Sequence, residues 1–186
     1  MYKMTSFMLA KEYTKDMKVP RKVYDGWAPP VGWLLSEKYD GYRARWMPND
    51  NHFLSRNNKV YSGTPDWFLS AMPNEFLDGE LFAGRDKFQD MGVVRKKNPD
   101  DEEWIPIKYV VYDLPEDKGT FEQRIVKLKK IVFETTKVWD KIKKELPEPF
   151  CDIPCPLVFT DQIKITSLDH LDKIYKDVLS KGGEGV

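Results

Sequence analysis

The sequence is poor in the side chains that usually bind structural metal ions. Its 186 residues include two cysteines and two histidines. Cys151 and Cys155 stand beside prolines, and His52 and His170 follow no recognisable ligand spacing. Because a structural zinc site takes four thiolate or imidazole ligands, we expect no zinc site and two ordinary reduced thiols.

The sequence also lacks a long apolar run and a leader. No stretch is apolar over the length that a membrane crossing needs. Residues 1–10 do not show the charged, apolar and small-residue regions of a signal peptide. Hydrophobic residues make up 41% and charged residues 32% of the chain, as in globular domains. These features predict an intracellular protein with no membrane partner.

An excess of charge of either sign is missing as well. The 30 basic side chains balance the 30 acidic ones, whereas proteins that bind nucleic acids usually carry a basic excess. A surface for nucleic acid would therefore have to be a local strip. Its candidates are Arg43, Arg45 and Arg56, then Arg95, Lys96 and Lys97, and then Lys127, Lys129 and Lys130, of which the last group also fits a solvated helix face.

Apolar patterns predict several strands. From Tyr42 to Trp46, ring or apolar side chains alternate with Arg43 and Arg45, which is the pattern of a half-buried strand. Residues 48–51 then form the turn to its partner strand. The strands are expected at residues 33–35, 42–46, 52–56, 76–82 and 107–114.

Three helices are predicted from their capping residues. The pair at residues 64–65 is expected to begin a short helix, with threonine as the N-cap and proline in the first helical position. Thr120 and Gln123 fit a capping box, which apolar residues at helical spacing follow. A last helix over residues 168–179 would end at the two glycines 182–183. This order of hairpins and helices is typical of an α+β domain.

The strongest sign of chemistry is the sequence Ser-Glu-Lys-Tyr-Asp-Gly-Tyr-Arg at residues 36–43. Lys38 follows a predicted strand, which would hold it in place, and the Asp-Gly pair lets the backbone turn behind it. An amine attacks phosphorus only when it is neutral, and a lysine in water has a pKa of about 10.4. A nucleophilic lysine therefore needs partial burial or a positive neighbour such as Arg43, which could also hold phosphate oxygens with two hydrogen bonds. The other interpretation is a plain hairpin turn with a surface lysine and arginine.

The spacing Lys-x-Asp-Gly-x-Arg, from Lys38 to Arg43, resembles the nucleophile motif of the covalent nucleotidyltransferases. These enzymes are ATP-dependent DNA ligases, RNA ligases and mRNA capping enzymes. Four further blocks resemble the family in its own order, at residues 55–57 (Ser-Arg-Asn), 77–81 (Leu-Asp-Gly-Glu-Leu), 109–113 and 184–186 (Glu-Gly-Val). Residues 82–89 and 121–124 are most similar to the small DNA ligases of phages, viruses and bacteria.

The resemblance implies a reaction and a set of site residues. Lys38 would attack ATP in the presence of Mg²⁺ and hold AMP through a P–N bond. The AMP would then pass to the 5′-phosphate of a nick in double-stranded DNA, during repair, replication or recombination. The implied contacts are Glu37, Lys38, Arg43, Glu80 (ribose) and Tyr112 (adenine) with ATP, Arg43 and Arg56 with the nick phosphate, and Glu80 and Glu184 with the metal. Without the resemblance, Glu80 and Arg56 would fit surface charges and Tyr112 would fit a core residue.

The resemblance also implies the architecture, a nucleotidyltransferase (ATP-grasp-like) α+β domain of antiparallel sheets flanked by helices. It would cover residues 27–186, after a lead segment over residues 1–26. Many ligases have a glutamate where Ser36 stands. The sequence also stops before the family's Lys-x-Lys strand and OB-fold domain, so we expect an incomplete domain with an uncovered sheet edge. By itself it should be a poor ligase, and a downstream segment or second chain would supply the rest.

Two alternatives stay open at this point. An mRNA capping guanylyltransferase or an RNA ligase would share the nucleophile motif, and GTP rather than ATP would label a capping enzyme. An inactive truncated remnant would take up no nucleotide. The place of action implied for a ligase is the cytoplasm of a bacterium or of an infected cell, or a site of viral DNA replication.

Overall fold

A five-stranded sheet forms one side of the molecule. The computed structural model describes residues 30–186, so the expected lead segment and the start of the expected domain lie outside the described residues. The strand order is β3-β2-β4-β5-β6. Neighbouring strands are antiparallel except β5 and β6, which are parallel. The strands are β2 (Tyr42–Met47), β3 (His52–Ser55), β4 (Leu77–Phe82), β5 (Lys108–Asp113) and β6 (Leu157–Phe159).

β2 is a strand, as predicted, but the prediction that only one of its faces is buried is wrong. Ala44 and Trp46 are buried as expected, yet Arg45 is only 5% exposed although it lies on the opposite face. Arg45 therefore cannot belong to a basic strip on the surface, and this candidate for a nucleic-acid contact is withdrawn. The alternation of residue types identified the strand, but it could not show that the centre of β2 is covered on both faces.

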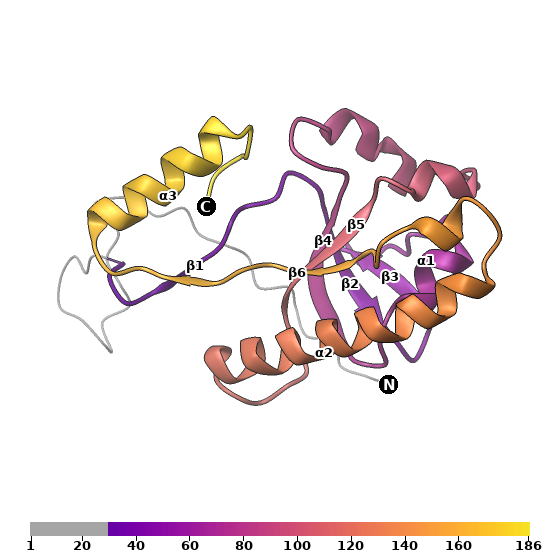
Figure 1. Cartoon of the computed structure of the whole chain (residues 1–186), viewed down its shortest axis with the longest axis horizontal. Helices are drawn as coiled ribbons and strands as arrows, with labels where there is room; N and C mark the ends of the chain where they lie inside the picture. Colours follow the sequence, from indigo (N-terminus) through magenta and orange to yellow (C-terminus); the bar gives the residue numbers. More distant parts are fainter. Residues whose placement is uncertain (1–29) are drawn as a thin grey trace.

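Helices cover the sheet and close its core. They are α1 (Asp66–Ser70), α2 (Phe121–Ile142) and the short 3-10 helices η1 (Phe88–Arg95), η2 (Asp101–Trp104), η3 (Lys143–Glu145) and η4 (Phe150–Asp152). The ring of Phe53 lies 4.8 Å from that of Tyr109, and Phe68 lies 5.0 Å from Trp104. Figure 1 shows α2 running along this sheet. We call this part, residues 42–159, the sheet side.

The helix starts are partly as predicted. Thr120 accepts a hydrogen bond from the Gln123 backbone and the Gln123 side chain accepts from the Thr120 backbone, so the capping box of α2 is confirmed. At α1 the N-cap is Pro65 rather than Thr64, and the Thr64 hydroxyl donates to the carbonyl of Tyr61 instead. The four 3-10 helices and β6 were not predicted from the sequence. All of them except η1 have only three or four residues, which is about one turn of helix or one repeat of a strand.

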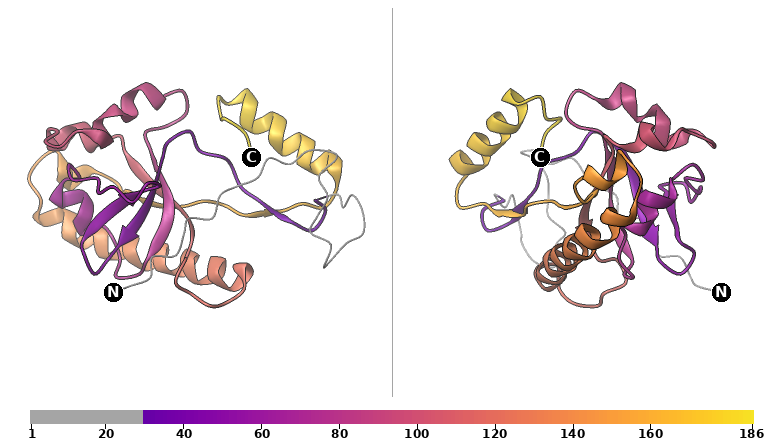
Figure 2. Two further views of the ribbon diagram at one scale, coloured as in Figure 1. Left: turned by 180° about the vertical axis from the view of Figure 1, so that it is seen from behind. Right: turned by 45° about the vertical axis from the view of Figure 1, so that its right-hand side comes forward.

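A second and smaller part of the chain stands apart from the sheet. It consists of β1 (Leu34–Leu35), which pairs with β7 (Ile163–Lys164), and α3 (Leu168–Ser180). The Ser167 side chain caps α3, and Gly182, with φ +77°, follows its end as predicted. In Figure 1 and in both views of Figure 2, α3 is separated from the sheet, and the chain after α3 turns back beneath this helix, where Gly185 pairs with Lys38 of the segment between β1 and β2. We call this part the α3 side.

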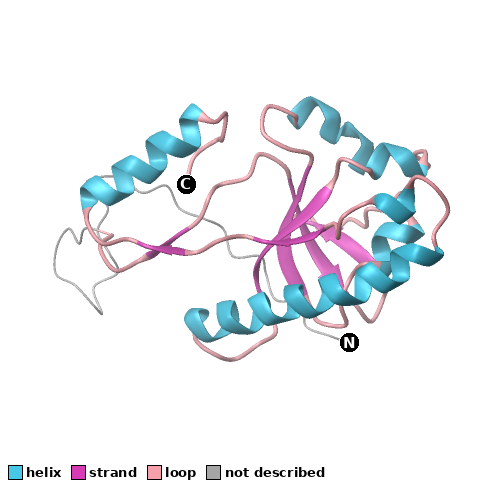
Figure 3. Ribbon diagram, in the orientation of Figure 1, coloured by secondary structure: helices cyan, strands magenta, loops and turns pink. Residues whose placement is uncertain are grey.

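Two extended segments connect the two sides. One leads from β1 to β2 and carries Lys38, and the other leads from β6 to β7. Figure 3 shows them as loops between the strands of the two sides. Within residues 30–186, none of the helices has both the length and the hydropathy that a membrane crossing requires.

Candidate active site

Lys38 is held by a bridge to the end of the chain. Its backbone N–H donates to the carbonyl of Gly185 at 2.9 Å, and the two residues form an isolated antiparallel bridge. The strand before Lys38 was expected to hold it, but β1 ends three residues earlier and the bridge takes that role. A Cβ atom at Gly41 would collide with the carbonyl of Leu81 in β4. Glycine at this position therefore lets the chain pass close to β4 as it enters β2.

The Lys38 side chain makes an ion pair with Glu184. The Nζ atom donates to Glu184 Oε1, and the two side chains are 58% and 39% exposed. The partial burial that the sequence interpretation required of a nucleophilic lysine is thus not present. The Nζ atom of Lys38 is instead held by the Glu184 carboxylate. Lys38 must therefore leave this pair before it can attack an electrophile.

Glu80 lies on the sheet face next to this pair. It stands opposite Arg43 in the register of β4 and β2. Burial raises the pKa of Glu80 to about 8, while the charges of Arg43 and Lys38 oppose this rise and those of Asp78 and Glu184 add to it. Glu80 also faces the segment that carries Lys38, because a Cβ atom at Gly41 would lie 2.9 Å from Glu80 Cγ.

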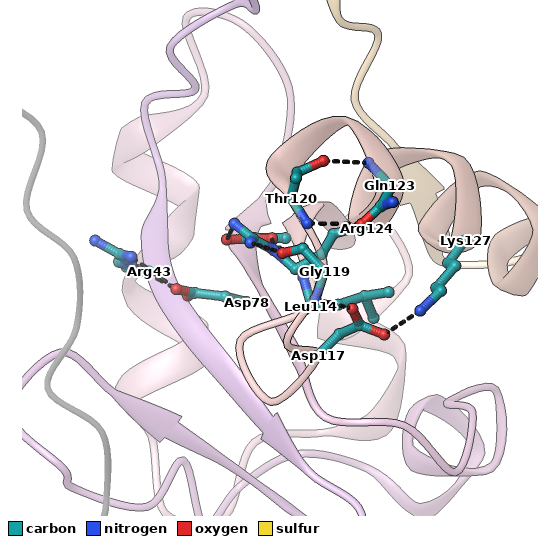
Figure 4. A network of polar contacts seen from close by, with 10 residues as sticks. Arg43, Asp78, Leu114, Asp117, Gly119, Thr120, Gln123, Arg124 and Lys127 are labelled. Atoms are coloured by element: carbon teal, nitrogen blue, oxygen red, sulfur yellow. Dashed lines mark hydrogen bonds and ion pairs between the residues drawn. The ribbon is translucent and has the colours of Figure 1, made fainter. Parts of the chain in front are cut away.

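Arg43 and Tyr112 lie beside Glu80. The Arg43 guanidinium donates to Asp78 through Nε at 3.1 Å and Nη2 at 2.7 Å, as Figure 4 shows. Its carbon lies 5.7 Å from the centre of the Tyr112 ring. The half-buried Tyr112 donates its hydroxyl to the carbonyl of Gly79 at 3.3 Å. The Arg43 guanidinium is thus paired with the Asp78 carboxylate, beside the Glu80 position on the sheet.

Glu37 is held in an ion pair, whereas Arg56 lies exposed in a turn. The Glu37 carboxylate accepts two hydrogen bonds from Arg85, at 2.8 and 2.7 Å. Arg56 is exposed in the turn after β3, where Ser55 pairs with Ala44, the neighbour of Arg43 in β2. The turn thus lies at the same end of β2 as Arg43. Sequence reasoning named Glu37 and Arg56 but missed Asp78 and Arg85, whose roles as partners depend on contacts between distant segments.

A pocket of about 880 Å³ lies elsewhere, between residues 70–76 and α2. Its lining contains none of the residues predicted for the site. Its charged lining residues include the Lys127–Asp117 ion pair but none from the segments that carry Lys38, Glu80 or Glu184. The candidate active site is therefore the charged surface around Lys38.

Known proteins resemble this chain over most of its length. A family model for the ATP dependent DNA ligase domain matches residues 7–186. A DNA ligase of Haemophilus influenzae is 33% identical over 119 residues, which are 64% of this chain and 43% of that protein.

Solved structures show the same fold. One from a study of DNA binding by Lig E DNA ligases is similar with a TM-score of 0.65 and 26% identity, over 83% of this chain and 54% of the other. The DNA ligase–adenylate of Chlorella virus is similar with a TM-score of 0.61 and 20% identity, over 83% of this chain and 53% of the other. The chain thus spans about half the length of the relatives that it matches.

Proposed function

The chain belongs to the ATP-dependent DNA ligase domain family, and we propose that it transfers AMP from ATP to Lys38. The observation that carries this proposal is the convergence of Lys38, Glu80 and Glu184 from three distant segments onto one site. A surface lysine in a plain hairpin turn would have no reason to lie between two such carboxylates.

The proposed step forms one bond and breaks another. The neutral Nζ atom of Lys38 attacks the α-phosphorus of ATP, a P–N bond forms, and pyrophosphate leaves with the electrons of the P–O bond. An ammonium nitrogen has no lone pair, so Lys38 must first give up its proton and its contact with Glu184. The exposure of both side chains leaves room for this separation, because water can solvate each one.

The two carboxylates fit a magnesium ion. Mg²⁺ is usually held by one or two carboxylates together with phosphate oxygens and water, and Glu80 and Glu184 offer two carboxylates at the site of transfer. Within the part of the chain that the structure describes, no group of three acidic, histidine or cysteine side chains could form a complete cage. When bound, Mg²⁺ would neutralise phosphate charge and assist the departure of pyrophosphate.

The other nucleotide contacts are assigned from the face of the sheet on which each side chain lies. Glu80 is placed to bind the ribose, and Tyr112 lies close enough on the same face to contact the adenine. Glu37, held by Arg85, would shape the entrance for ATP through its backbone. This assignment explains why Glu80, Arg43 and Tyr112 occupy adjacent positions in three neighbouring strands.

Sealing of a DNA nick is proposed as the following stage. AMP would pass from Lys38 to the 5′-phosphate, with Arg43 and Arg56 holding that phosphate at one end of β2. A downstream segment or a second chain with a Lys-x-Lys strand and an OB fold would complete this stage. The chain alone is expected to seal nicks poorly.

Labelling with nucleotide tests the proposed function. The chain is incubated with Mg²⁺ and either α-labelled ATP or α-labelled GTP, and the label bound to protein is counted. We expect label from ATP, none from GTP, and none from ATP in Lys38→Ala, while the exposed control Lys59→Ala keeps the label. Label from GTP would favour a capping enzyme, and no label from either nucleotide would favour an inactive remnant.

A further inference from the structure

An ion pair ties the residue before Lys38 to the loop that follows β4. Arg85 Nε donates to Glu37 Oε1 at 2.8 Å, and Arg85 Nη2 donates to Glu37 Oε2 at 2.7 Å. Two parallel hydrogen bonds fix the orientation of both planar groups as well as their distance. The side chains are 33% and 15% exposed, so water screens this pair less than it screens a fully solvated one.

The same carboxylate touches the stretch that leads to Glu184. A Cβ atom at Gly183 would lie 3.2 Å from Glu37 Oε1, and one at Gly182 would collide with the carboxylate of Asp86. Glycines at these positions let the end of the chain approach the loop closely. We call Glu37, Arg85, Asp86, Gly182 and Gly183 the clasp.

The clasp joins the sheet side to the α3 side, and these two parts share little apolar packing. No side chain of α3, β1 or β7 belongs to the hydrophobic core cluster of the sheet side, as far as residues 30–186 are concerned. Glu184 nevertheless has to lie beside Lys38, and Lys38 beside Glu80. With no shared core, polar contacts must fix these distances, and the clasp lies two residues or fewer from both Lys38 and Glu184.

Tyr39 anchors the other side of Lys38. Its hydroxyl shares a hydrogen bond of 3.1 Å with Thr160, and its ring lies 5.1 Å from Phe82. Lys38 thus stands between an anchor to the sheet through Tyr39 and an anchor through Glu37. Only the Glu37 anchor also reaches the stretch before Glu184, which makes Arg85 its central residue.

We propose that Arg85 is a positioning residue for the transfer of AMP, because its ion pair with Glu37 holds Lys38 and Glu184 against the sheet face that carries Glu80. This inference rests on the proposed function for its catalytic consequence, but its structural part stands alone. Arg85 itself touches neither ATP nor the reacting atoms.

Three variants test the proposal. Arg85→Ala should slow the labelling of Lys38 about tenfold, since it removes two charge-assisted hydrogen bonds. Arg85→Lys should lose part of the rate, and the charge exchange Glu37→Arg with Arg85→Glu should recover most of the rate that Arg85→Ala loses. The matched control is Lys127→Ala, which breaks the Lys127–Asp117 ion pair on the sheet side, and it should label at the rate of the unchanged chain.

A second measurement does not need ATP. The Lys38 amide donates to Gly185, so its hydrogen exchange reports the bridge directly. Arg85→Ala should speed exchange at Lys38 about tenfold while β4 and β5 exchange as before, and the charge exchange should reverse this. A purely structural role would instead lower protection throughout the chain, β4 and β5 included.

The outcomes separate the two proposals. If the unchanged chain takes no AMP from ATP, the proposed function fails, and amide exchange at Lys38 alone decides the role of Arg85. If the unchanged chain takes AMP and Arg85→Ala labels equally fast, the inference about Arg85 is wrong while the proposed function stands. Equal exchange at Lys38 in both chains overturns the inference in either case.

Discussion

The sheet side contains a large buried core, whereas the apolar residues of α3 are exposed or only partly buried, apart from Val178. Trp104, Trp139, Phe53 and Tyr109 are each fully buried in the core of the sheet side. In the α3 side, the exposed fractions of Trp33, Leu168, Tyr175 and Leu179 are between 42% and 44%. Val178 is the one residue of α3 that is buried. The sheet side therefore has a core of its own, and the α3 side depends on strand pairing and polar contacts.

This difference matters because the proposed site draws on both sides. Arg43, Glu80 and Tyr112 come from strands with a firm core beneath them. Glu184 comes from the end of the α3 side, and Lys38 from the segment between the two. The proposed nucleotide-binding face is thus fixed by the core, while the position of Glu184 beside Lys38, the proposed nucleophile, depends on the clasp and the bridge from Lys38 to Gly185.

The largest expected difference is between two leucine-to-alanine substitutions, one in α2 and one in α3. Leu128→Ala in α2 removes a fully buried leucine and should lower the free energy of unfolding by about 3 kcal/mol. Leu179→Ala in α3 removes a leucine that is 42% exposed and should cost less than about 1 kcal/mol. Urea unfolding of both variants measures the two costs. Equal costs would show that the α3 side is packed as firmly as the sheet side.

Hydrogen exchange sharpens the comparison. Amides of β4 and β5, in the middle of the sheet, should exchange only when the whole chain unfolds. Amides of α3 should exchange at least about a hundredfold faster, because α3 can open without disturbing the core. Exchange followed by fragmentation and mass spectrometry compares the two segments in one sample. Similar protection of α3 and β5 would argue against two sides of unequal stability.

The third expected effect is on the pH dependence of stability. Burial raises the pKa of Glu80 from its ordinary value of 4.5 to about 8. Between these pH values the folded chain holds a proton that the unfolded chain has released, so its stability falls as the pH rises through this window. Glu80→Gln removes the titrating group and should flatten the decline, with its largest relative gain above pH 8.

The exposed Glu75→Gln is the control for this measurement. It should leave the curve of urea midpoint against pH unchanged, because Glu75 lies on the surface. If Glu80→Gln has the same slope as the unchanged chain, Glu80 ionises in the folded chain as it does in the unfolded one, and the account of its burial is wrong.

Sequence patterns were most informative where a regular element repeats. The alternation in β2 and the capping box at Thr120 predicted their elements, since both depend on neighbours along the chain. The burial of Arg45 and the N-cap at Pro65 were missed, because they depend on what covers each residue. The family resemblance of the fold is confirmed by the family model and by the similar structures.

The candidate site, like the fold, was predicted only in part from the sequence. The motif at residues 38–43 and the glutamates at 80 and 184 were named from the sequence, and the structure brings Lys38, Arg43, Glu80 and Glu184 together. Asp78 and Arg85 lie in two of the matching blocks, but neither was assigned a role as a partner. Each of them balances the charge of a residue more than thirty positions away in the sequence, and single-sequence patterns do not record such pairs.

The most direct test of the account is to locate the AMP on the protein. The chain is incubated with Mg²⁺ and ATP and cleaved under conditions that preserve the P–N bond, and the modified peptide is fragmented in a mass spectrometer. The account predicts AMP on the Nζ atom of Lys38, in the peptide that contains Asp40 and Gly41. AMP on any other lysine, or equal AMP in Lys38→Ala, would contradict it.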